Sequence, residues 1–272
     1  MGDDNRILID LVMKIWHISD THTYHRLLEV PTDIDMVIFS GDCSNPRDPY
    51  NNEVEVRGFI DWYRSLKIPY KIFVAGNHDT SIENKFVTKE DFERHKIIYL
   101  ENESVTINGL KIFGSPYTPT FGYGWAFNKD RNKLERFWRN AVDEDVDIIV
   151  THGPPKGILD LSFDYHNNLE RCGDKSLLNR VMEVNPKLVL FGHIHNCQDV
   201  VNQGTMKLSN LDTIFSNGSV MKDGRFGVLT SDGNVIEIQT NESKKTLLEK
   251  IKYELERVFQ KYRSSSKIKI KG

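Results

Sequence analysis

Five short groups of carboxylate, carboxamide and imidazole residues recur along the chain, each directly after an apolar run. They are Asp20-Thr21-His22, Gly41-Asp42, Gly76-Asn77-His78-Asp79, His152 and Gly192-His193-Ile194-His195. None relies on a thiolate. The mix of oxygen and imidazole donors suits manganese, iron, zinc, cobalt or nickel better than a structural thiolate zinc site. Singly, each group is explained by a helix cap, a turn or a hydrogen-bonded loop. Their shared position after apolar runs favours one metal centre.

The apolar runs that precede these groups are predicted to be buried strands. They are Lys14–Ile18, Asp35–Phe39, Ile68–Ala75, Val146–Val150 and Pro186–Phe191. A helix-spaced stripe over residues 56–66 separates the second run from the third. This order of strand, loop, strand, helix and strand predicts an α/β fold with a mostly parallel sheet. Ligands bind beyond the carboxyl ends of the strands in such a sheet, so the five groups are expected to meet in one crevice.

Two of the groups hold pairs of residues two positions apart. If each pair continues its strand, Asp20 and His22 share one face, and so do His193 and His195. The second pair is hard to explain as core packing, because two buried imidazoles are costly to satisfy there. The spacing therefore indicates that the two members of each pair converge.

The remaining segments predict further helices, a hairpin and an antiparallel region. Asn108-Gly109 joins Ser104–Ile107 to Leu110–Phe113 as a type I′ hairpin. Helices are expected near residues 89–95, 134–142 and 175–184, with a loop of over 20 residues before the last. After residue 195 we expect antiparallel strands at residues 213–215, 226–230 and 235–239. Residues 1–12 fit either an edge strand or a short helix.

Length and composition favour one large domain. The chain has 272 residues, of which 39% are hydrophobic and 28% charged. We predict one main domain over residues 13–240, an amphipathic helix over 241–262 packed on it, and a basic tail over 263–272. The formal net charge of the chain is −3. Residues 241–272 carry ten Lys and Arg against four Glu, a net charge of +6, so the first 240 residues have a net charge of −9.

Three scattered cysteines indicate neither a disulfide framework nor a zinc motif, which fits a reducing compartment. No apolar run approaches the roughly 20 residues that a membrane span needs. The acidic start Met1–Asp4 does not look like a secretory leader. We therefore expect a cytoplasmic protein with no membrane partner.

Taken together, the five groups resemble the motifs of the calcineurin-like metallophosphoesterase superfamily. Gly114-Ser-Pro-Tyr-Thr-Pro119, Trp125-Ala-Phe127, Thr151–Asp160 and Cys172-Gly173 are similar to its small MPPED-type members. The segment Cys43–Arg47 lacks the Val-Asp-Arg-Gly signature of protein phosphatases, which counts against a phosphoprotein substrate. The resemblance implies a four-layer αββα sandwich of mixed sheets flanked by helices, to which the predicted C-terminal amphipathic helix is added.

The resemblance also implies two divalent metal ions, with manganese the first choice. Asp20, His22 and His195 would hold one ion, and Asn77, His152 and His193 the other, with Asp42 bridging them. A metal-bridging hydroxide is then expected to attack phosphorus. His78, which is not needed as a ligand, is the predicted general acid. Asp79 either orients His78 or caps the turn.

The substrate is the least determined feature. Asn77, Phe121 and Trp125 are candidate substrate-binding residues, because aromatic faces stack on nucleobases. Packing that holds the Phe121–Phe127 loop explains the aromatic residues as well. Lys156 and Arg171 either pair with phosphate or are simply solvated.

The resemblance favours small phosphodiesters such as cyclic nucleotides. A phosphomonoesterase, a nuclease and a non-catalytic metal-binding module stay open, although the acidic main body disfavours long nucleic acid. The sequence does not indicate an oligomeric state.

Overall fold

The computed structural model describes residues 8–164, 166–222 and 227–243. The chain divides into a large compact unit, residues 13–238, and a second unit of residues 1–12 and 239–272. In the second unit the described residues are the outer ends of β1 (Leu8–Ile18) and β15 (Asn234–Ser243). The predicted helix over 241–262 lies outside the described residues beyond Ser243, and so does the whole predicted tail over 263–272.

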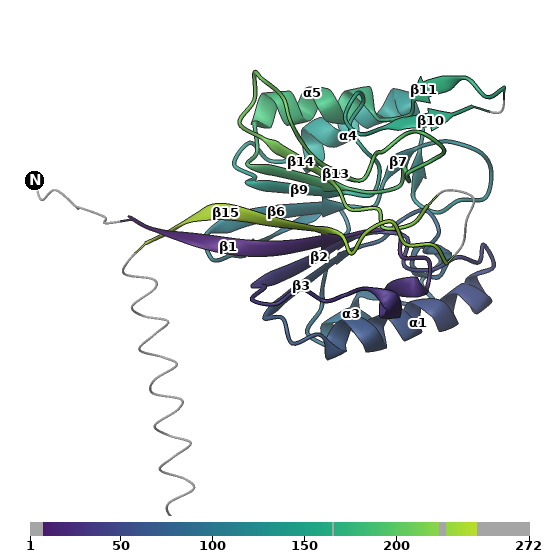
Figure 1. The fold of residues 1–272 in the computed structure, drawn as a ribbon, viewed down its shortest axis with the longest axis horizontal. Helices are drawn as coiled ribbons and strands as arrows, with labels where there is room; N and C mark the ends of the chain where they lie inside the picture. Colours follow the sequence, from purple (N-terminus) through teal and green to yellow (C-terminus); the bar gives the residue numbers. More distant parts are fainter. Residues whose placement is uncertain (1–7, 165, 223–226, 244–272) are drawn as a thin grey trace, which may run out of the picture. The chain divides into compact units, whose positions relative to one another are not determined.

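The chain is an α/β fold with two mixed sheets flanked by helices (Figure 1). The first sheet has the order β15-β1-β2-β3-β4, with β2 (Met36–Ser40), β3 (Tyr70–Val74) and β4 (Ile98–Tyr99) running parallel to β1. The second has the order β13-β14-β12-β9-β6-β5, namely Gly204–Lys207, Ile214–Asn217, Leu188–Phe191, Ile148–Thr151, Leu110–Ser115 and Glu103–Ile107. Its four central strands are parallel, and β13 and β5 are antiparallel edge strands.

Alternation along the central strands separates three apolar clusters. In β2, Val37 and Phe39 face the helices, whereas Met36 and Ile38 face the second sheet. This two-residue period is what a strand with both faces buried requires. β9 alternates in the same way, because Ile149 lies in the outer cluster of its own sheet while its neighbours face the first sheet. The sheets therefore pack face to face, with one apolar cluster between them and one outside each.

Helices cover the outer clusters. α1 (Pro49–Ser65) packs Phe59 on Phe39 of the first sheet, with ring centroids 4.4 Å apart. On the second sheet, α4 (Arg131–Ala141) and α5 (Lys175–Val184) bury Trp138 and Leu177. The shorter elements are η1 (Tyr24–Leu27), α2 (Thr80–Glu83), α3 (Lys89–Glu93) and the two-stranded pairs β7 (Thr118–Pro119) with β8 (Asn128–Lys129) and β10 (Leu161–Phe163) with β11 (Leu169–Arg171).

Local sequence signals explain where several elements begin and end. Pro49 opens α1 directly after Asp48, whose carboxylate accepts a hydrogen bond from the Asn51 backbone N. α5 spans the predicted residues. The hairpin prediction is confirmed, since both Asn108 (φ 49°) and Gly109 (φ 78°) are left-handed, as a type I′ turn requires.

Three expectations for the rest of the chain are wrong. The described residues of the predicted strand 226–230 form a turn and one isolated bridge, Met221 to Leu229. The region after residue 195 is not simply antiparallel, because β14 pairs in parallel with β12. The long loop before α5 contains the hairpin β10–β11. Residues 8–12 are strand, but they extend β1 rather than forming a strand of their own.

Candidate metal centre

The five predicted groups follow strands of both sheets. Asp20, Asp42 and Asn77 come after β1, β2 and β3, whereas His152 and His193 come after β9 and β12. Backbone hydrogen bonds hold neighbouring ends together, from Asp20 N to Gly41 O at 2.8 Å and from Gly192 N to His152 O at 2.9 Å. The groups thus meet at one edge, as expected, but at the edge shared by two packed sheets rather than along a single sheet.

The side chains gather into two largely buried clusters. One contains Asp20, His22 and His195, and the other contains Asp42, His152 and His193; a third group, His22, Asp42 and His78, overlaps both. In the first, His195 Nε2 lies 3.2 Å from Asp20 Oδ1 and 3.3 Å from His22 Nε2.

In the second cluster, His152 Nε2 lies 2.9 Å from Asn77 Oδ1 and 3.4 Å from Asp42 Oδ2. Two ligand atoms that share one ion at about 2.1 Å are roughly 3 Å apart. The donor spacing in both clusters therefore fits metal coordination, and all seven predicted ligand residues lie there.

The imidazoles are oriented by backbone carbonyls. His152 Nδ1 lies 2.9 Å from Ser40 O, and His22 Nδ1 lies 3.2 Å from Ser44 O. When Nδ1 donates its proton to a carbonyl, Nε2 presents a lone pair. This is the arrangement that surrounds histidine ligands in metal sites, because the carbonyl fixes both the tautomer and the ring plane. A neutral His22 ring aims the Nε2 lone pair into the first cluster, and the His152 ring would do the same in the second cluster once a cation displaces its Nε2 proton.

The backbone is left-handed at several of the candidate ligands. Asp20, His22, Asp42 and His193 have φ values of 54°, 42°, 61° and 67°. Such values are unfavourable for residues with a Cβ and concentrate at functional sites. The expectation that each pair continues its strand is therefore wrong: the chain turns at Asp20 and at His193. As a result, His193 and His195 lie in different clusters.

Two motif glycines permit this close packing. A Cβ on Gly76 would overlap Asp42 Oδ1, and a Cβ on Gly192 would overlap Ser19 Oγ and Asp20 Oδ2. At these positions a side chain would occupy the space that the carboxylates need. Glycine is thus required by the close approach of neighbouring loops.

Buried carboxylates and imidazoles shift one another's pKa values in the two clusters. Burial raises the pKa of Asp20, but hydrogen bonding and the charge of His195 outweigh this and bring it to about 2. Burial lowers the pKa of His152, whereas Asp42 raises it, with a net value of about 9. Burial lowers the pKa of His22 to about 4 and that of His193 to about 3. Ionised carboxylates beside two neutral imidazoles form a site suited to a cation.

His78 and Asp79 have separate roles. His78 Nδ1 lies 3.0 Å from Asn45 O, and its Nε2 lies 3.9 Å from Asp42 Oδ2 at the edge of the clusters. The Asp79 carboxylate instead accepts hydrogen bonds from the backbone of the loops that carry Asp42 and Asn77. Asp79 therefore holds these loops together rather than orienting the His78 ring.

Part of the predicted aromatic loop borders the clusters. Trp125 lies against His78 with centroids 4.3 Å apart, and Phe121 lies against His193 at 4.8 Å. Both line a hollow of about 200 Å³ together with Asp42 and Asn77. Phe127, by contrast, is buried in the core.

Sequence reasoning missed several supporting residues. Ser40, Ser44 and Asn45 act through backbone carbonyls, which no side-chain motif reveals. Arg47 stacks its guanidinium 3.9 Å from the Trp125 ring. Its only sequence signal is its place in the loop after Asp42.

The two packed mixed sheets carry a carboxylate and imidazole cluster at one edge, and its donors suit a site for two metal ions. The family model of the calcineurin-like phosphoesterases matches residues 13–197. The chain belongs to this family.

Several known proteins are similar to the chain. Metallophosphoesterase domain-containing protein 1 of Homo sapiens, like that of Mus musculus, is 36% identical over 218 residues, which cover 71% of this chain and 64% of the relative. The chain thus spans less than two thirds of those relatives' length. A UPF0046 protein of Caenorhabditis elegans is 31% identical over 211 residues, covering 73% of this chain and 69% of the relative.

Solved structures share the fold. The phosphopantetheinyl hydrolase PptH of Mycobacterium tuberculosis superposes with a TM-score of 0.53 at 16% identity, over 82% of this chain and 95% of that one. Among the described residues, no helix has the length and apolarity that crossing a membrane would take.

Proposed function

We propose that the chain is a phosphodiesterase that uses two divalent metal ions, manganese first among them. Asp20, His22 and His195 hold one ion, and Asn77, His152 and His193 hold the other. The observation that carries this assignment is the position of Asp42. Its Oδ2 lies 3.4 Å from His152 Nε2 and 4.0 Å from His22 Nε2, so one carboxylate faces both clusters. When bound, two such ions activate a water molecule and neutralise the charge of the phosphoryl oxygens.

His78 is proposed as the general acid. The other donors would provide three ligands for each ion, with Asp42 as the bridge. The His78 imidazole is then not needed as a ligand and is available for proton transfer. The contact with Asn45 O supports an orientation in which Nε2 faces the clusters. Nε2–H donates its proton to the leaving oxygen as the phosphorus–oxygen bond breaks. Such proton transfer typically contributes about 10²–10⁴ in rate, and most when the leaving group is poor.

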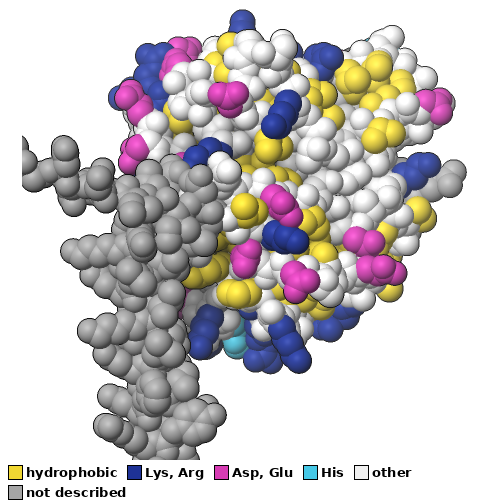
Figure 2. All heavy atoms as spheres, turned by 60° about the vertical axis from the view of Figure 1, so that its left-hand side comes forward, with side chains coloured by type: hydrophobic (Ala, Val, Ile, Leu, Met, Phe, Trp, Pro, Cys, Tyr) yellow, Lys and Arg dark blue, Asp and Glu magenta, His cyan; other side chains and the backbone are white. Residues whose placement is uncertain are grey.

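The surroundings favour a small substrate. Phe121 and Trp125 stack at 6.2 Å with planes 22° apart, beside the Asn77 amide, and together they suit a nucleobase or another flat group. The first 240 residues carry a net charge of −9, and the face in Figure 2, which is turned away from the carboxyl ends of the strands, carries interspersed acidic and basic side chains. Long nucleic acid prefers a continuous basic track. Small phosphodiesters such as cyclic nucleotides are therefore preferred to a polymer, and a cytoplasmic location remains a prediction.

Turnover of model esters tests the proposal. Manganese-loaded protein is assayed on bis(p-nitrophenyl) phosphate, p-nitrophenyl phosphate and cyclic nucleotides, and bound metal is measured by elemental analysis. We expect the diester to be hydrolysed faster than the monoester. The Asp42→Asn variant should lose both activity and metal. Bound metal without turnover of any ester would contradict the proposal and favour a non-catalytic module, and a preference for the monoester would indicate a phosphomonoesterase.

Leaving-group dependence tests His78. The His78→Ala variant should lose roughly 10²–10⁴ of the rate on a cyclic nucleotide, whose alkoxide leaves poorly, and much less on the nitrophenyl diester. His95→Ala, which removes a histidine distant in sequence from every motif, is the control. Equal losses on both substrates would remove His78 from proton transfer, as would full activity of the variant.

A further inference from the structure

A second hollow adjoins the metal centre. It has a volume of about 620 Å³ and shares Phe121, Ser162, His193 and Ile194 with the hollow that contains Asp42 and His78. It continues past Phe121 toward the start of α4 and the hairpin β10–β11. A ligand whose phosphoester lies at the clusters can therefore reach into it.

Cations outnumber anions on the wall of this second hollow. Arg131, Lys156 and Arg171 line it, with Glu170 as the carboxylate among the lining residues. Arg171 is partly neutralised, because its Nη1 lies 3.0 Å from Oδ1 of the fully buried Asp160. Over the described ranges, neither Arg131 nor Lys156 forms an ion pair. Two exposed and uncompensated positive charges thus remain beside the hollow.

The backbone holds both cations at this wall. Arg131 is the first residue of α4, directly after Asp130, whose carboxylate accepts from Asn132 N at 2.9 Å. Lys156 follows the His152 loop, and its backbone N donates to Asp174 O at 3.0 Å. Both charges also reach Cys172 on the wall: burial and the charge of Glu170 raise the pKa of its thiol, and Arg131 and Lys156 oppose this rise.

We propose that the second hollow binds a second anionic group of the substrate, a phosphate in particular, through Arg131 and Lys156. The inference rests on the proposed function, since it assumes that one phosphoester lies at the metal clusters. It extends that function from phosphodiesters in general to substrates that carry another phosphate beyond the reacting one. Charge-assisted hydrogen bonds from Lys and Arg are the usual means of holding such groups.

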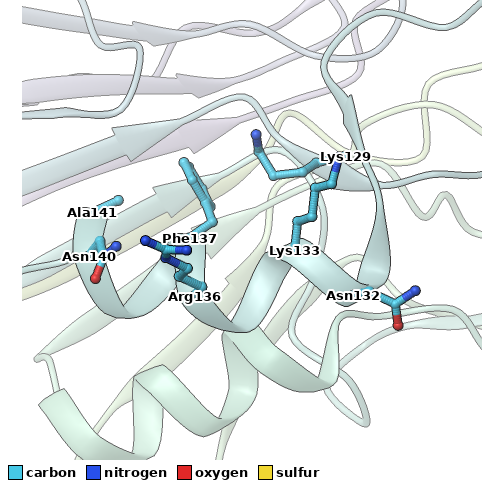
Figure 3. A pocket seen from close by; sticks show the side chains of 7 residues that line it. All are labelled: Lys129, Asn132, Lys133, Arg136, Phe137, Asn140 and Ala141. Carbon is cyan, nitrogen blue, oxygen red and sulfur yellow. The ribbon is translucent and has the colours of Figure 1, made fainter.

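A basic hollow elsewhere on α4 provides a matched control. Lys129, Lys133 and Arg136 surround Phe137 there (Figure 3). Lys129 Nζ lies 4.0 Å from the Tyr117 ring centroid and 4.8 Å from that of Phe137. This hollow shares no lining residue with the two described above. Arg136→Gln therefore removes the same charge from the same helix without touching the proposed subsite.

Binding of two matched nucleotides tests the inference. Adenosine 5′-monophosphate and adenosine 3′,5′-bisphosphate share base and sugar and differ by one phosphate. Their dissociation constants are measured by calorimetry on the manganese-loaded protein for wild type, Lys156→Gln, Arg131→Gln and Arg136→Gln. We expect wild type to prefer the bisphosphate. Lys156→Gln and Arg131→Gln should each reduce that preference by roughly three- to tenfold, and Arg136→Gln should leave it unchanged.

Equal affinity of wild type for the two nucleotides would overturn the inference. So would an equal loss of preference in Arg136→Gln, because the effect would then reflect overall charge. Thermal melting of each variant shows that the fold is retained. Calorimetry measures binding without turnover, so it tests the subsite alone. The proposed phosphodiesterase function is tested separately, and absence of bis(p-nitrophenyl) phosphate hydrolysis by the same preparation would contradict it.

Discussion

The buried carboxylate of Asp79 fastens together the loops that carry Asp42 and Asn77. Its Oδ2 accepts hydrogen bonds from Gly76 N at 2.8 Å and Asp42 N at 3.0 Å. Its Oδ1 accepts from Cys43 N at 3.1 Å and Ser44 Oγ at 2.7 Å. Two loops that carry candidate metal ligands and follow different strands are thus held by one side chain. Asp79→Asn should therefore weaken both the fold and the metal centre.

The size of the effect follows from the geometry. An amide has only one accepting oxygen, so either the donors on Oδ1 or those on Oδ2 face an NH₂ group. Two buried N–H groups that lose their acceptor cost about 1–3 kcal/mol each, or roughly 2–6 kcal/mol together. Burial and the charge of Asp42 raise the pKa of Asp79, so removing its charge recovers part of this cost. We expect the free energy of unfolding to fall by about 2–4 kcal/mol.

Two measurements check this prediction. Urea denaturation followed by circular dichroism gives the loss of stability, and calorimetry gives the Mn²⁺ affinity, which should fall roughly 10–100-fold because the carboxylate supports ligand loops. Asp147→Asn is the control. Asp147 accepts from Lys111 N at 2.9 Å at the amino end of β9, so metal affinity should not change. Wild-type stability and metal affinity in Asp79→Asn would refute the reasoning.

Two further predictions concern packing and pH. Gly192→Ala should lower the free energy of unfolding by about 1–3 kcal/mol and weaken metal binding, because the added Cβ overlaps Asp20 Oδ2. Gly58→Ala is the control, since a Cβ there meets open space. Equal melting temperatures and metal affinities for the Gly192 variant and wild type would contradict the prediction. Burial lowers the pKa of His17 to about 3 despite the opposing charge of Asp20, so the folded protein keeps this ring neutral. Stability contributed by the neutral ring is present above pH 6.5 and lost as the pH falls toward 3, and from pH 6.5 to 5 the loss is about 1.5–2 kcal/mol. His17→Gln should be less acid-sensitive by that amount in urea denaturation at the two pH values, and parallel losses in both proteins would rule out His17 as the source.

Much of the fold was accessible from local signals. The runs over 35–39 and 186–191 are apolar on both faces, and β2 and β12 are fully buried central strands. Asn108-Gly109 specifies its hairpin because both residues tolerate positive φ. The prediction of a strand over 226–230 was wrong for the described residues 227–230. Pairing partners, rather than β propensity, decide whether a short segment becomes a strand.

For the candidate site, too, the sequence predicted some features and the tertiary structure alone decided others. Residue types and their positions after strands determined the donor set, the absence of thiolate ligands and the expectation of a shared edge. Tertiary structure alone decided that three donor loops come from one sheet and two from the other, that His193 and His195 separate, and that Asp79 ties loops instead of aiming His78. Arg131 stands 21 residues before His152 in the sequence. It also comes to the second hollow only through the packing of α4. The physical reason is that chemical type is a property of each residue, whereas proximity between residues far apart in sequence is set by how two sheets bury their apolar faces against each other.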